Sequence, residues 1–434
     1  MSRPIPRPST VLNRIPGGRD GRRMLVVSII DKTGTGLWAS CTVLYFTYVS
    51  GLGLGQVGLL MTVSGGVGIA GAPLAGRLAD RFPLVKIIVG AQLLRGAALL
   101  LLLTTDNLLL LTLYSALGAL PDRAGSVLIK LYAARLAGPD RARYQAIQRT
   151  TVNIGWSIGG LGAAAALATG STRAYGLLLL ANVVTYLVIA ALTLRCAEPP
   201  APSRVAAASA EPGDPSGDPG DPAPTPPTSP WRDRTFLGYT ATDAVLFLDD
   251  TILQVAVPLW IVHATTAPIG LAPLLLVLNT VLVVLFQVPL ARFATTTRAA
   301  RRLLVPLTAL LFVGTLALAA SAAGGTALAI TALVVAVIAL TFAEIIHATA
   351  SWELSVALAP AHAQGSYLGV HGLAQSTQRF AGPLLVTGVM AAGALAWPLL
   401  GLGLVAAGAA QHRLIRDRLT KPSLSVPKVT VSEH

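Results

Sequence analysis

The sequence predicts an all-α integral membrane protein whose twelve transmembrane helices form two six-helix bundles. Three observations support this prediction. Of the 434 residues, 53% are hydrophobic and 12% are charged, whereas a soluble domain has about 25% charged residues. Apolar stretches long enough to cross a bilayer recur along nearly the whole chain. Basic residues gather in alternate connections between these stretches.

The first half of the chain contains six candidate spans, each with roughly 20 mostly apolar residues. Residues 1–23 before them are basic and rich in Pro, and a full-length span follows rather than a short cleavable segment. We therefore expect a cytoplasmic tail at 1–23 and the first bundle at 24–196. The spans lie at about 24–50, 56–76, 86–105, 108–134, 144–168 and 174–194.

The composition changes abruptly after residue 196. Pro and Gly are too dense within 197–234 for a packed element, which predicts a flexible cytoplasmic linker. The second bundle is expected at 235–411 and a cytoplasmic tail at 412–434. Because two of the spans nearly touch, counts of eleven and thirteen are the alternatives to twelve. The six spans lie at about 235–263, 268–292, 302–322, 325–350, 364–391 and 393–411.

The positions of Lys and Arg predict the orientation in the membrane. With the N-terminus inside, four of the five expected inner loops carry basic residues, and the opposite loops carry only Arg173. This asymmetry accounts for the net charge of +13. The basic residues form no single patch with interleaved aromatics, which argues against nucleic-acid binding. We expect a multi-pass protein of the cell membrane with both termini cytoplasmic.

Short internal matches indicate that the two bundles are repeats. The tripeptide Pro-Leu-Ala occurs at Pro73 and again at Pro289, 216 residues later, and Lys86 and Arg302 share this offset. An even number of spans and a central linker fit the same arrangement. We interpret it as a parallel repeat, which is typical of many transporters.

The inner loop between the second and third spans carries the most specific motif, GRLADRFPLVK, from Gly76 to Lys86. It resembles the loop motif of the major facilitator superfamily of transporters at Gly76, Asp80, Arg81 and Lys86. The chain departs from that motif at the two positions after Phe82, where it has Pro and Leu in place of Gly and a basic residue. The resemblance implies that Asp80 and its basic neighbours hold the halves together in the outward-facing state. The alternative is a loop Asp that balances nearby arginines.

A second, Gly-rich segment runs from Gly155 to Gly162 in the fifth span. Drug/proton antiporters of the same superfamily often carry a Gly-rich motif there with a Gly-Pro pair, and this chain resembles them without the Pro. Close packing of helices through small residues explains the glycines directly. We favour packing as the interpretation.

Ionisable side chains inside spans are costly and usually face a cavity or a partner. The spans also contain further ionisable side chains, among them Arg95, Lys130, Asp243 and His371. Eight ionisable residues are our candidates for proton coupling or substrate binding: Asp31, Asp122, Arg123, Asp249, Asp250, Glu344, His347 and Arg379.

Three roles compete for the buried carboxylates: proton exchange, pairing with a cationic substrate, and a structural ion pair with Arg95, Arg123 or Arg379. For Asp122 we favour a structural pair with the adjacent Arg123, and for Asp31 the adjacent Lys32 leaves both interpretations open. Asp249 and Asp250 have no basic residue in their own span, which favours a functional role. Glu344 and His347 share one helix face because they are three residues apart. For Glu344 we favour function, and for His347 packing.

Together these features predict a secondary active transporter that works by alternating access. We expect proton-coupled efflux of a small lipophilic or cationic compound, with proton-coupled uptake of a small metabolite or a non-transporting sensor as alternatives. We expect no enzyme activity and no cofactor beyond the proton gradient, since the chain has no ATP-binding motif, no catalytic motif and no metal-ligand spacing. The partners are the lipid bilayer, protons and the substrate, and we expect a monomer.

Overall fold

The computed structural model describes residues 15–167, 169, 171–199, 229–268 and 270–420. Most of the expected linker, and the ends of both expected tails, lie outside these residues. The described part folds into twelve helical passes, in agreement with the predicted all-α membrane architecture. Several passes are longer than expected; the first helix already begins at Gly18 and the last continues to Thr420.

The first half consists of six passes, the second of which is interrupted near Ala70. Asn107 begins the fourth pass because its side chain accepts hydrogen bonds from the N–H groups of Leu109 and Leu110, at 2.9 and 3.3 Å. The passes are α2 (Gly18–Tyr48), α3 with α4 (Leu54–Ile69 and Gly71–Arg81), α5 (Leu84–Leu102), α6 (Leu108–Ala137), α7 (Arg141–Leu167) and α8 (Thr172–Leu194).

The second half repeats this pattern with an irregular first pass. Its helix is broken at Phe247 and contains a π-helical turn at Ile252–Ala256, a feature that is frequent at functional sites. The passes are α10, α11 and α12 (Arg234–Leu246, Leu248–Thr251 and Val257–Ala264), α13 (Leu271–Ala291), α14 with α15 (Thr297–Arg302 and Leu304–Ala320), α16 (Thr326–Leu358), α17 (Gln364–Ala391) and α18 (Ala396–Thr420).

Seven helices in the described residues are long and apolar enough to cross a membrane by length and composition alone. They include α5 and α8 in the first half and α16 in the second. The remaining passes carry more polar or charged residues; α2, for example, contains both Asp31 and Lys32. Polar residues within a span require a partner or a cavity, both in these passes and in the apolar ones, which contain Asp249 and Glu344.

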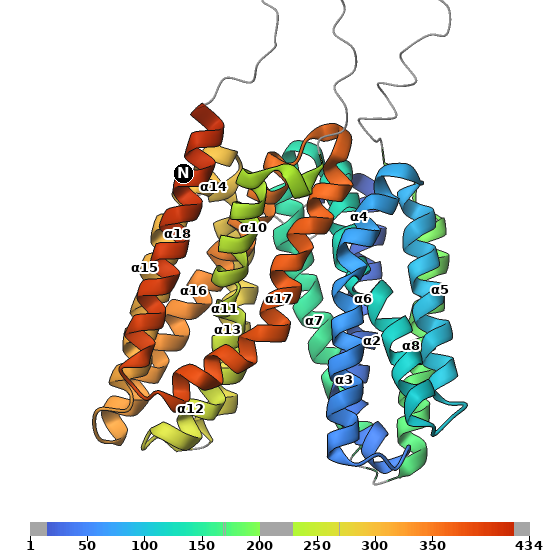
Figure 1. The fold of residues 1–434 in the computed structure, drawn as a ribbon, viewed down its shortest axis with the longest axis horizontal. Helices are drawn as coiled ribbons and strands as arrows, with labels where there is room; N and C mark the ends of the chain where they lie inside the picture. The colour runs from blue at the N-terminus through green and yellow to red at the C-terminus, as the bar shows by residue number, and fades with distance from the viewer. Residues whose placement is uncertain (1–14, 168, 170, 200–228, 269, 421–434) are drawn as a thin grey trace, which may run out of the picture.

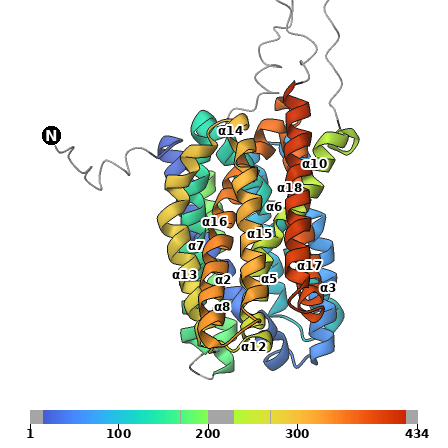
Figure 2. The same ribbon diagram turned by 90° about the vertical axis from the view of Figure 1, so that its left-hand side faces the viewer.

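Each half has its own hydrophobic core. Fully buried aromatic side chains mark the two cores, with Tyr132 in the first half and Tyr239 and Trp397 in the second. Figure 2 shows α13, α15, α16 and α18 of the second half packed side by side along one flank. The first core also includes Val356 and Leu368 of the second half, so buried apolar side chains contribute to the contact between the halves.

The halves meet at one end and separate toward the other. Figure 1 shows the contact at the end where α2 begins and α18 finishes, called here the terminal face, and the helices diverging below it. Near the middle of the molecule, charged side chains between the halves are partly exposed: Arg149 by 28% and Asp122 by 38%. The molecule is therefore closed at the terminal face and open toward the opposite face.

Two sets of glycines allow helices to approach closely. Gly76 of α4 lies against Gly365 and Gly369 of α17, where a Cβ atom would collide with backbone across the interface between the halves. Within the first half, Gly155 and Gly159 of α7 lie against the backbone of α2 in the same way. The Gly-rich segment of the fifth pass therefore packs helices, as we predicted from its composition.

Candidate functional site

The loop motif places Asp80 at the contact between the halves. Its carboxylate accepts hydrogen bonds from the N–H groups of Gly365 and Ser366, at 2.8 and 2.7 Å, and from the Ser366 hydroxyl at 2.6 Å. These groups belong to the first turn of α17, where free N–H groups and the helix dipole favour an anion. Asp80 thus joins the first half to the start of a helix in the second half.

The other residues of the motif have different positions. Gly76 provides the close approach of α4 to α17 described above. The side chains of Arg81 and Lys86 are exposed, and no described contact between the halves involves them. Of the basic neighbours that the motif resemblance assigned to this contact, neither Arg81 nor Lys86 reaches the second half in this state.

A second contact at the terminal face is a charged pair that we did not predict. Arg141 of α7 donates two hydrogen bonds to Glu353 of α16, from Nε at 2.8 Å and from Nη2 at 2.6 Å. Glu353 is 2% exposed. A paired guanidinium and carboxylate of this geometry is strong and directional. The pair fixes α7 to α16 on the far side of the interface from α4.

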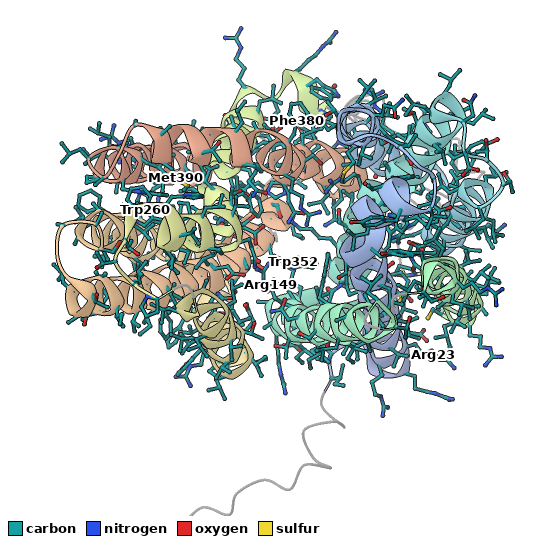
Figure 3. The ribbon with its side chains drawn as sticks, turned by 90° about the horizontal axis from the view of Figure 1, so that it is seen from below. Arg23, Arg149, Trp260, Trp352, Phe380 and Met390 are labelled. Carbon is teal, nitrogen blue, oxygen red and sulfur yellow. The ribbon has the colours of Figure 1, made fainter. Side chains whose placement is uncertain are left out.

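Deeper in the molecule, a second ion pair crosses between the same two helices. Arg149 of α7 pairs with Glu344 of α16, and Asn279 of α13 donates to the same carboxylate at 3.0 Å. Glu344 is 14 residues from the end of α16, which is about 21 Å from the terminal face. Viewed from the open side in Figure 3, Arg149 lies between the two halves. Glu344, a predicted site residue, therefore sits at the base of the opening.

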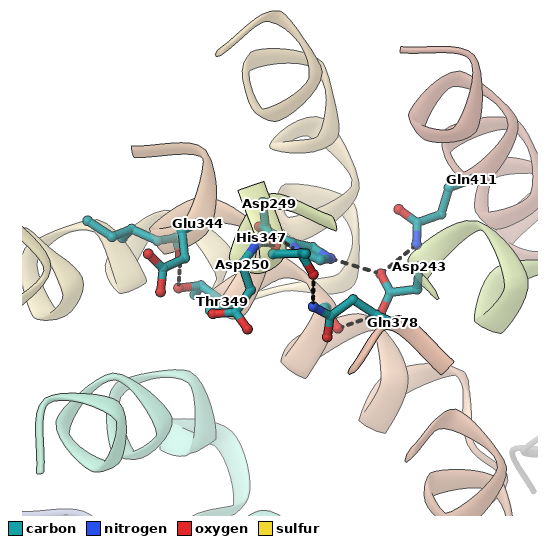
Figure 4. Close-up of polar contacts among 12 residues, drawn as sticks. Asp243, Asp249, Asp250, Glu344, His347, Thr349, Gln378 and Gln411 are labelled. Carbon is teal, nitrogen blue, oxygen red and sulfur yellow. Dashed lines mark hydrogen bonds and ion pairs between the residues drawn. The ribbon is translucent and has the colours of Figure 1, made fainter. Parts of the chain in front are cut away.

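A buried hydrogen-bonded chain starts from Asp249 in the same half. Asp249 is 2.9 Å from Nδ1 of His347, whose Nε2 is 3.3 Å from Asp243. All three side chains are at most 2% exposed. Figure 4 shows this chain running across from α11 through α16 to α10. Asp249 thus has a basic partner after all, supplied by another helix.

Asp243 is the most heavily bonded carboxylate of this chain. It accepts hydrogen bonds from the Ser351 hydroxyl at 2.7 Å and from the Gln411 amide at 2.8 Å, and it lies 2.8 Å from Nε2 of His371. Four helices, α10, α16, α17 and α18, contribute to this cluster. Such saturation stabilises the ionised carboxylate inside the protein.

Asp250 differs from its neighbour. Within the part of the chain that the structure describes, no side chain donates a hydrogen bond to its carboxylate, and its backbone N–H bonds to Asp249 at 2.7 Å. The charges of Glu344, Arg149 and Arg379 act on it from nearby. Asp250 is therefore the carboxylate of this site that is free to take a proton or a cationic group.

In the first half, Arg95 is the centre of a separate charge cluster. Its guanidinium lies 2.6 Å from Asp31 and 2.8 Å from Asp122, and its carbon is 4.4 Å from the centre of the Tyr186 ring. Lys32 is 2.8 Å from Asp31. Asp122 is therefore in a structural ion pair, the role that we favoured, but its partner is Arg95 rather than the adjacent Arg123. Consecutive residues of a helix point in different directions, so the partner comes from α5.

Arg123 faces the other half instead. It lies near Arg379 of α17, and the two like charges repel each other across the interface. Lys130, two turns further along α6, reaches the second half as well, with Nζ 5.1 Å from the centre of the Trp352 ring. The charge of Asp243 acts on this ammonium group. These cations give the first half a positive inner surface opposite the acidic cluster.

The described residues contain no group of three or more His, Cys, Asp or Glu side chains arranged to hold a metal ion. The acids and histidines above are instead hydrogen bonded to one another and to amides and hydroxyls. An arrangement of this kind is suited to binding and passing protons.

The comparison with known families decides the identity of the fold. The sequence profile of the Major Facilitator Superfamily matches residues 26–383, which include parts of both halves. The chain belongs to the major facilitator superfamily. This membership confirms the resemblance based on the Gly76–Lys86 motif, and it indicates a multi-pass membrane protein whose fold supports secondary transport. Members of the superfamily are generally not enzymes.

Solved structures of this superfamily match more than nine tenths of the chain at low sequence identity. A bacterial homologue of the iron transporter ferroportin, in an outward-facing state with soaked iron, has 13% identity and a TM-score of 0.67, over 92% of this chain and 99% of that one. The proton:xylose symporter XylE, bound to 6-bromo-6-deoxy-D-glucose, has 13% identity and a TM-score of 0.66, over 91% and 96%. The human organic anion transporter MFSD10 has 15% identity and a TM-score of 0.55, over 91% of this chain and 99% of that one. No curated protein matches the chain by sequence.

Compared with the superfamily motif, the site at mid-depth was harder to find from the sequence. Asp243, His371 and Arg149 belong to this site but are not among the eight candidates from the sequence, although the first two are ionisable residues in apolar spans. Arg149 lies in a polar stretch at the start of α7, with no sign in the sequence that it crosses to Glu344. Pairing across 195 residues depends on the tertiary fold.

Proposed function

We propose that this protein is a proton-coupled exporter of small lipophilic cations. The observation that carries the proposal is that two carboxylates with different roles lie in the same site. Asp250 is free of side-chain donors, and Glu344 holds the halves together through Arg149. Both lie near mid-depth, where superfamily transporters bind substrate between their halves. A cation attracted to Asp250 therefore arrives near the Arg149–Glu344 ion pair, which must break before the terminal face opens.

The hydrogen-bonded chain of Asp249, His347 and Asp243 supports proton coupling. A His ring between two carboxylates can accept a proton on one nitrogen and release one from the other. The chain begins next to Asp250 in the sequence and extends toward α18, away from the opening. We infer that protons which leave Asp250 or Glu344 move along this chain as the halves rearrange.

The charge distribution supports a specific order of events. Three cations of the first half, Lys130, Arg141 and Arg149, face acids of the second half. When a proton neutralises Glu344, the attraction to Arg149 is lost and the terminal face can open. Binding of a cationic substrate from that side then displaces the proton. If the termini are cytoplasmic, as the basic loops predict, the present state is outward-facing and this cycle exports the substrate.

The proposal is tested in liposomes that contain the purified protein and an internal pH dye. A proton gradient is imposed, and a panel of lipophilic cations is added with wild type, Asp250→Asn and Glu344→Gln. We expect substrate-triggered proton movement in wild type and a loss of at least about tenfold in both variants, as for the removal of a proton-transfer group. Binding of the cations without any movement would contradict transport and indicate a sensor.

One observation favours a second candidate, proton-coupled uptake of a small metabolite. Arg123 and Arg379 face each other from opposite halves, and a carboxylate or phosphate group between them would relieve their repulsion. The same liposomes distinguish the two functions. Proton movement triggered by small organic anions, and lost in Arg379→Gln, would support uptake and contradict the export of cations.

A further inference from the structure

A groove lies on the outer surface of the second half, between α10–α11 and α17. Its volume is about 410 Å³, within the range of sites that hold a small organic molecule. Along α17 the lining runs from Val370 to Leu385, which is about 22 Å at the rise of an α-helix. The size and length suit an elongated molecule rather than a compact one.

The lining is mostly apolar, and its rim is exposed. Trp231, Val245 and Leu385 are 45%, 39% and 43% exposed. Because α10–α12 form one of the apolar membrane-spanning segments, this rim faces lipid when the protein is in a bilayer. Trp231 lies at the terminal-face end, where an indole ring prefers the boundary between lipid and water. A molecule in the groove would therefore come from the lipid phase.

Two buried polar oxygens in the lining have no hydrogen-bond partner among the residues that the structure describes. They are Oγ1 of Thr240 and Oε1 of Gln378, in side chains that are 7% and 4% exposed. The nearby Thr242 donates to the carbonyl of Gly238 at 2.9 Å, as threonines in helices commonly do. Within the hydrocarbon region no bulk water satisfies such groups. A carboxamide oxygen only accepts hydrogen bonds, so its missing partner must be a donor.

Gln378 also connects the groove to the proposed site. Its amide nitrogen donates to the hydroxyl of Thr251, the residue after Asp250. A phospholipid acyl chain has no hydrogen-bond donor and would leave Oε1 unsatisfied. A lipophilic ammonium ion has both the donor for Gln378 and the charge for Asp250. The chemistry of the groove thus selects among molecules that dissolve in the bilayer.

We propose that this groove, called here the α10–α17 groove, binds lipophilic amines from the lipid phase, with the ammonium N–H donated to Gln378 and the apolar part lying toward Trp231. The proposal rests on the proposed function, because it supplies the route by which a lipophilic cation approaches Asp250. It adds a requirement for an N–H donor that charge alone does not impose.

The test uses the full protein in phosphatidylcholine nanodiscs and two bromine-labelled probes. One is 12-bromododecylamine, which has N–H donors, and the other is its trimethylammonium analogue, which has the same charge and none. Bromine quenches tryptophan fluorescence on contact. The difference between wild type and Trp231→Phe isolates the signal of Trp231 from the other tryptophans.

We expect saturable quenching of Trp231 by the amine. Gln378→Leu should raise the half-saturating amine concentration about tenfold and that of the trimethylammonium probe less than twofold. The matched control is Gln375→Leu, in the same helix but outside the groove lining, which should change neither. Gln378→Glu should bind the amine more tightly than wild type. Ala241→Phe and Ala381→Phe, both at exposed positions, should remove the quenching by filling the groove.

Two results would overturn the groove assignment: no quenching of Trp231 by the amine, or equal quenching by both probes that Gln378→Leu leaves unchanged. Measuring transport of the amine in the liposome assay distinguishes a failure of the groove proposal from a failure of the proposed export function. Normal transport in both filled variants would leave export standing and show that the groove is not the route. Groove binding without transport in wild type would contradict export alone.

Discussion

Arg149 of α7 and Glu344 of α16 form an ion pair that joins the two halves about 21 Å below the terminal face. Asn279 donates to the same carboxylate, so the pair is held in position from within the second half as well. Above it, Arg141 with Glu353 and Asp80 with Ser366 complete the closure. Together with weaker contacts such as that of Lys130 with Trp352, these three connect the halves in the described part of the chain. The Arg149–Glu344 pair, the deepest of the three, lies near the free carboxylate of Asp250.

Neutralising this deep pair should uncouple transport from the proton gradient. Glu344→Gln keeps hydrogen bonds to Arg149 and Asn279 but removes the exchangeable charge. We expect exchange of substrate across liposomes at near wild-type rates, with gradient-driven accumulation reduced at least about tenfold. Asp106→Asn, an exposed loop change, should affect neither measurement. Gradient-driven accumulation that survives in Glu344→Gln would exclude Glu344 as the coupling residue.

Removing the charge of Asp80 should weaken closure of the terminal face. A hydrogen bond to a charged group contributes about 1.5–3 kcal/mol, and Asn retains part of it, so the closed state should lose about 1.4 kcal/mol, a tenfold change in population. The change is measured as the distance between spin labels on Arg143→Cys and Arg298→Cys, two exposed positions near this face, with Cys41 and Cys196 replaced by Ser.

The longer distance should become more populated in Asp80→Asn and not in Asp140→Asn, which removes a similar charge from an exposed position of the same face. Equal distance distributions in wild type and Asp80→Asn would show that the bonds to α17 do not stabilise closure.

Adding a methyl group at Gly76 should prevent the close approach of α4 to α17. The new Cβ would overlap the carbonyl of Gly365, and neither backbone can retreat without separating the halves. We expect Gly76→Ala to shift the same label distances further than Asp80→Asn does. Gly90→Ala is the matched control, because a Cβ at Gly90 meets open space. Normal closure and transport in Gly76→Ala would contradict the tight contact.

The acid stability of the protein should depend on Asp233, which lies at the terminal face before α10. Burial opposes its ionisation, but hydrogen bonds from the Phe236 N–H, Arg418 and Tyr367 outweigh burial and lower its pKa. A lowered pKa in the folded protein means that the ionised Asp233 stabilises the folded state. Because an Asp in an unfolded chain has a pKa of about 3.9, this contribution to folding stability is complete above that pH. It is lost as the pH falls through the lowered pKa of the folded state.

At pH 7, Asp233→Asn should therefore be less stable than wild type by about 1 kcal/mol, since the Arg418 pair is partly exposed. The difference should shrink as the pH falls below 4. Thermal unfolding in detergent at pH 7 and pH 3.5 measures it, with Asp106→Asn as the control. A difference of the same size at both values would show that the charge of Asp233 is not what stabilises this end of α10.

The fold was predictable because span length and basic loops depend on local composition. The position of Asp80 followed from a motif in one loop, and Glu344 and Asp249 were conspicuous as acids in apolar spans. Their partners were not predictable in the same way. Arg95 rather than Arg123 binds Asp122, and His347 of another helix binds Asp249, because helix rotation and packing decide which side chains meet. The broken helix at Phe247, which orients Asp249 and Asp250, likewise depends on tertiary contacts.

The central claim is that a cation and a proton compete for the same carboxylates. It is tested most directly by calorimetric titration of the purified protein with tetraphenylphosphonium, a permanently charged cation with no proton of its own, in two buffers of different ionisation enthalpy. We predict that binding releases protons to the buffer in wild type and that Asp250→Asn and Glu344→Gln reduce this release. Tight binding with the same heat in both buffers would mean that no proton is displaced, and it would contradict the proposed coupling.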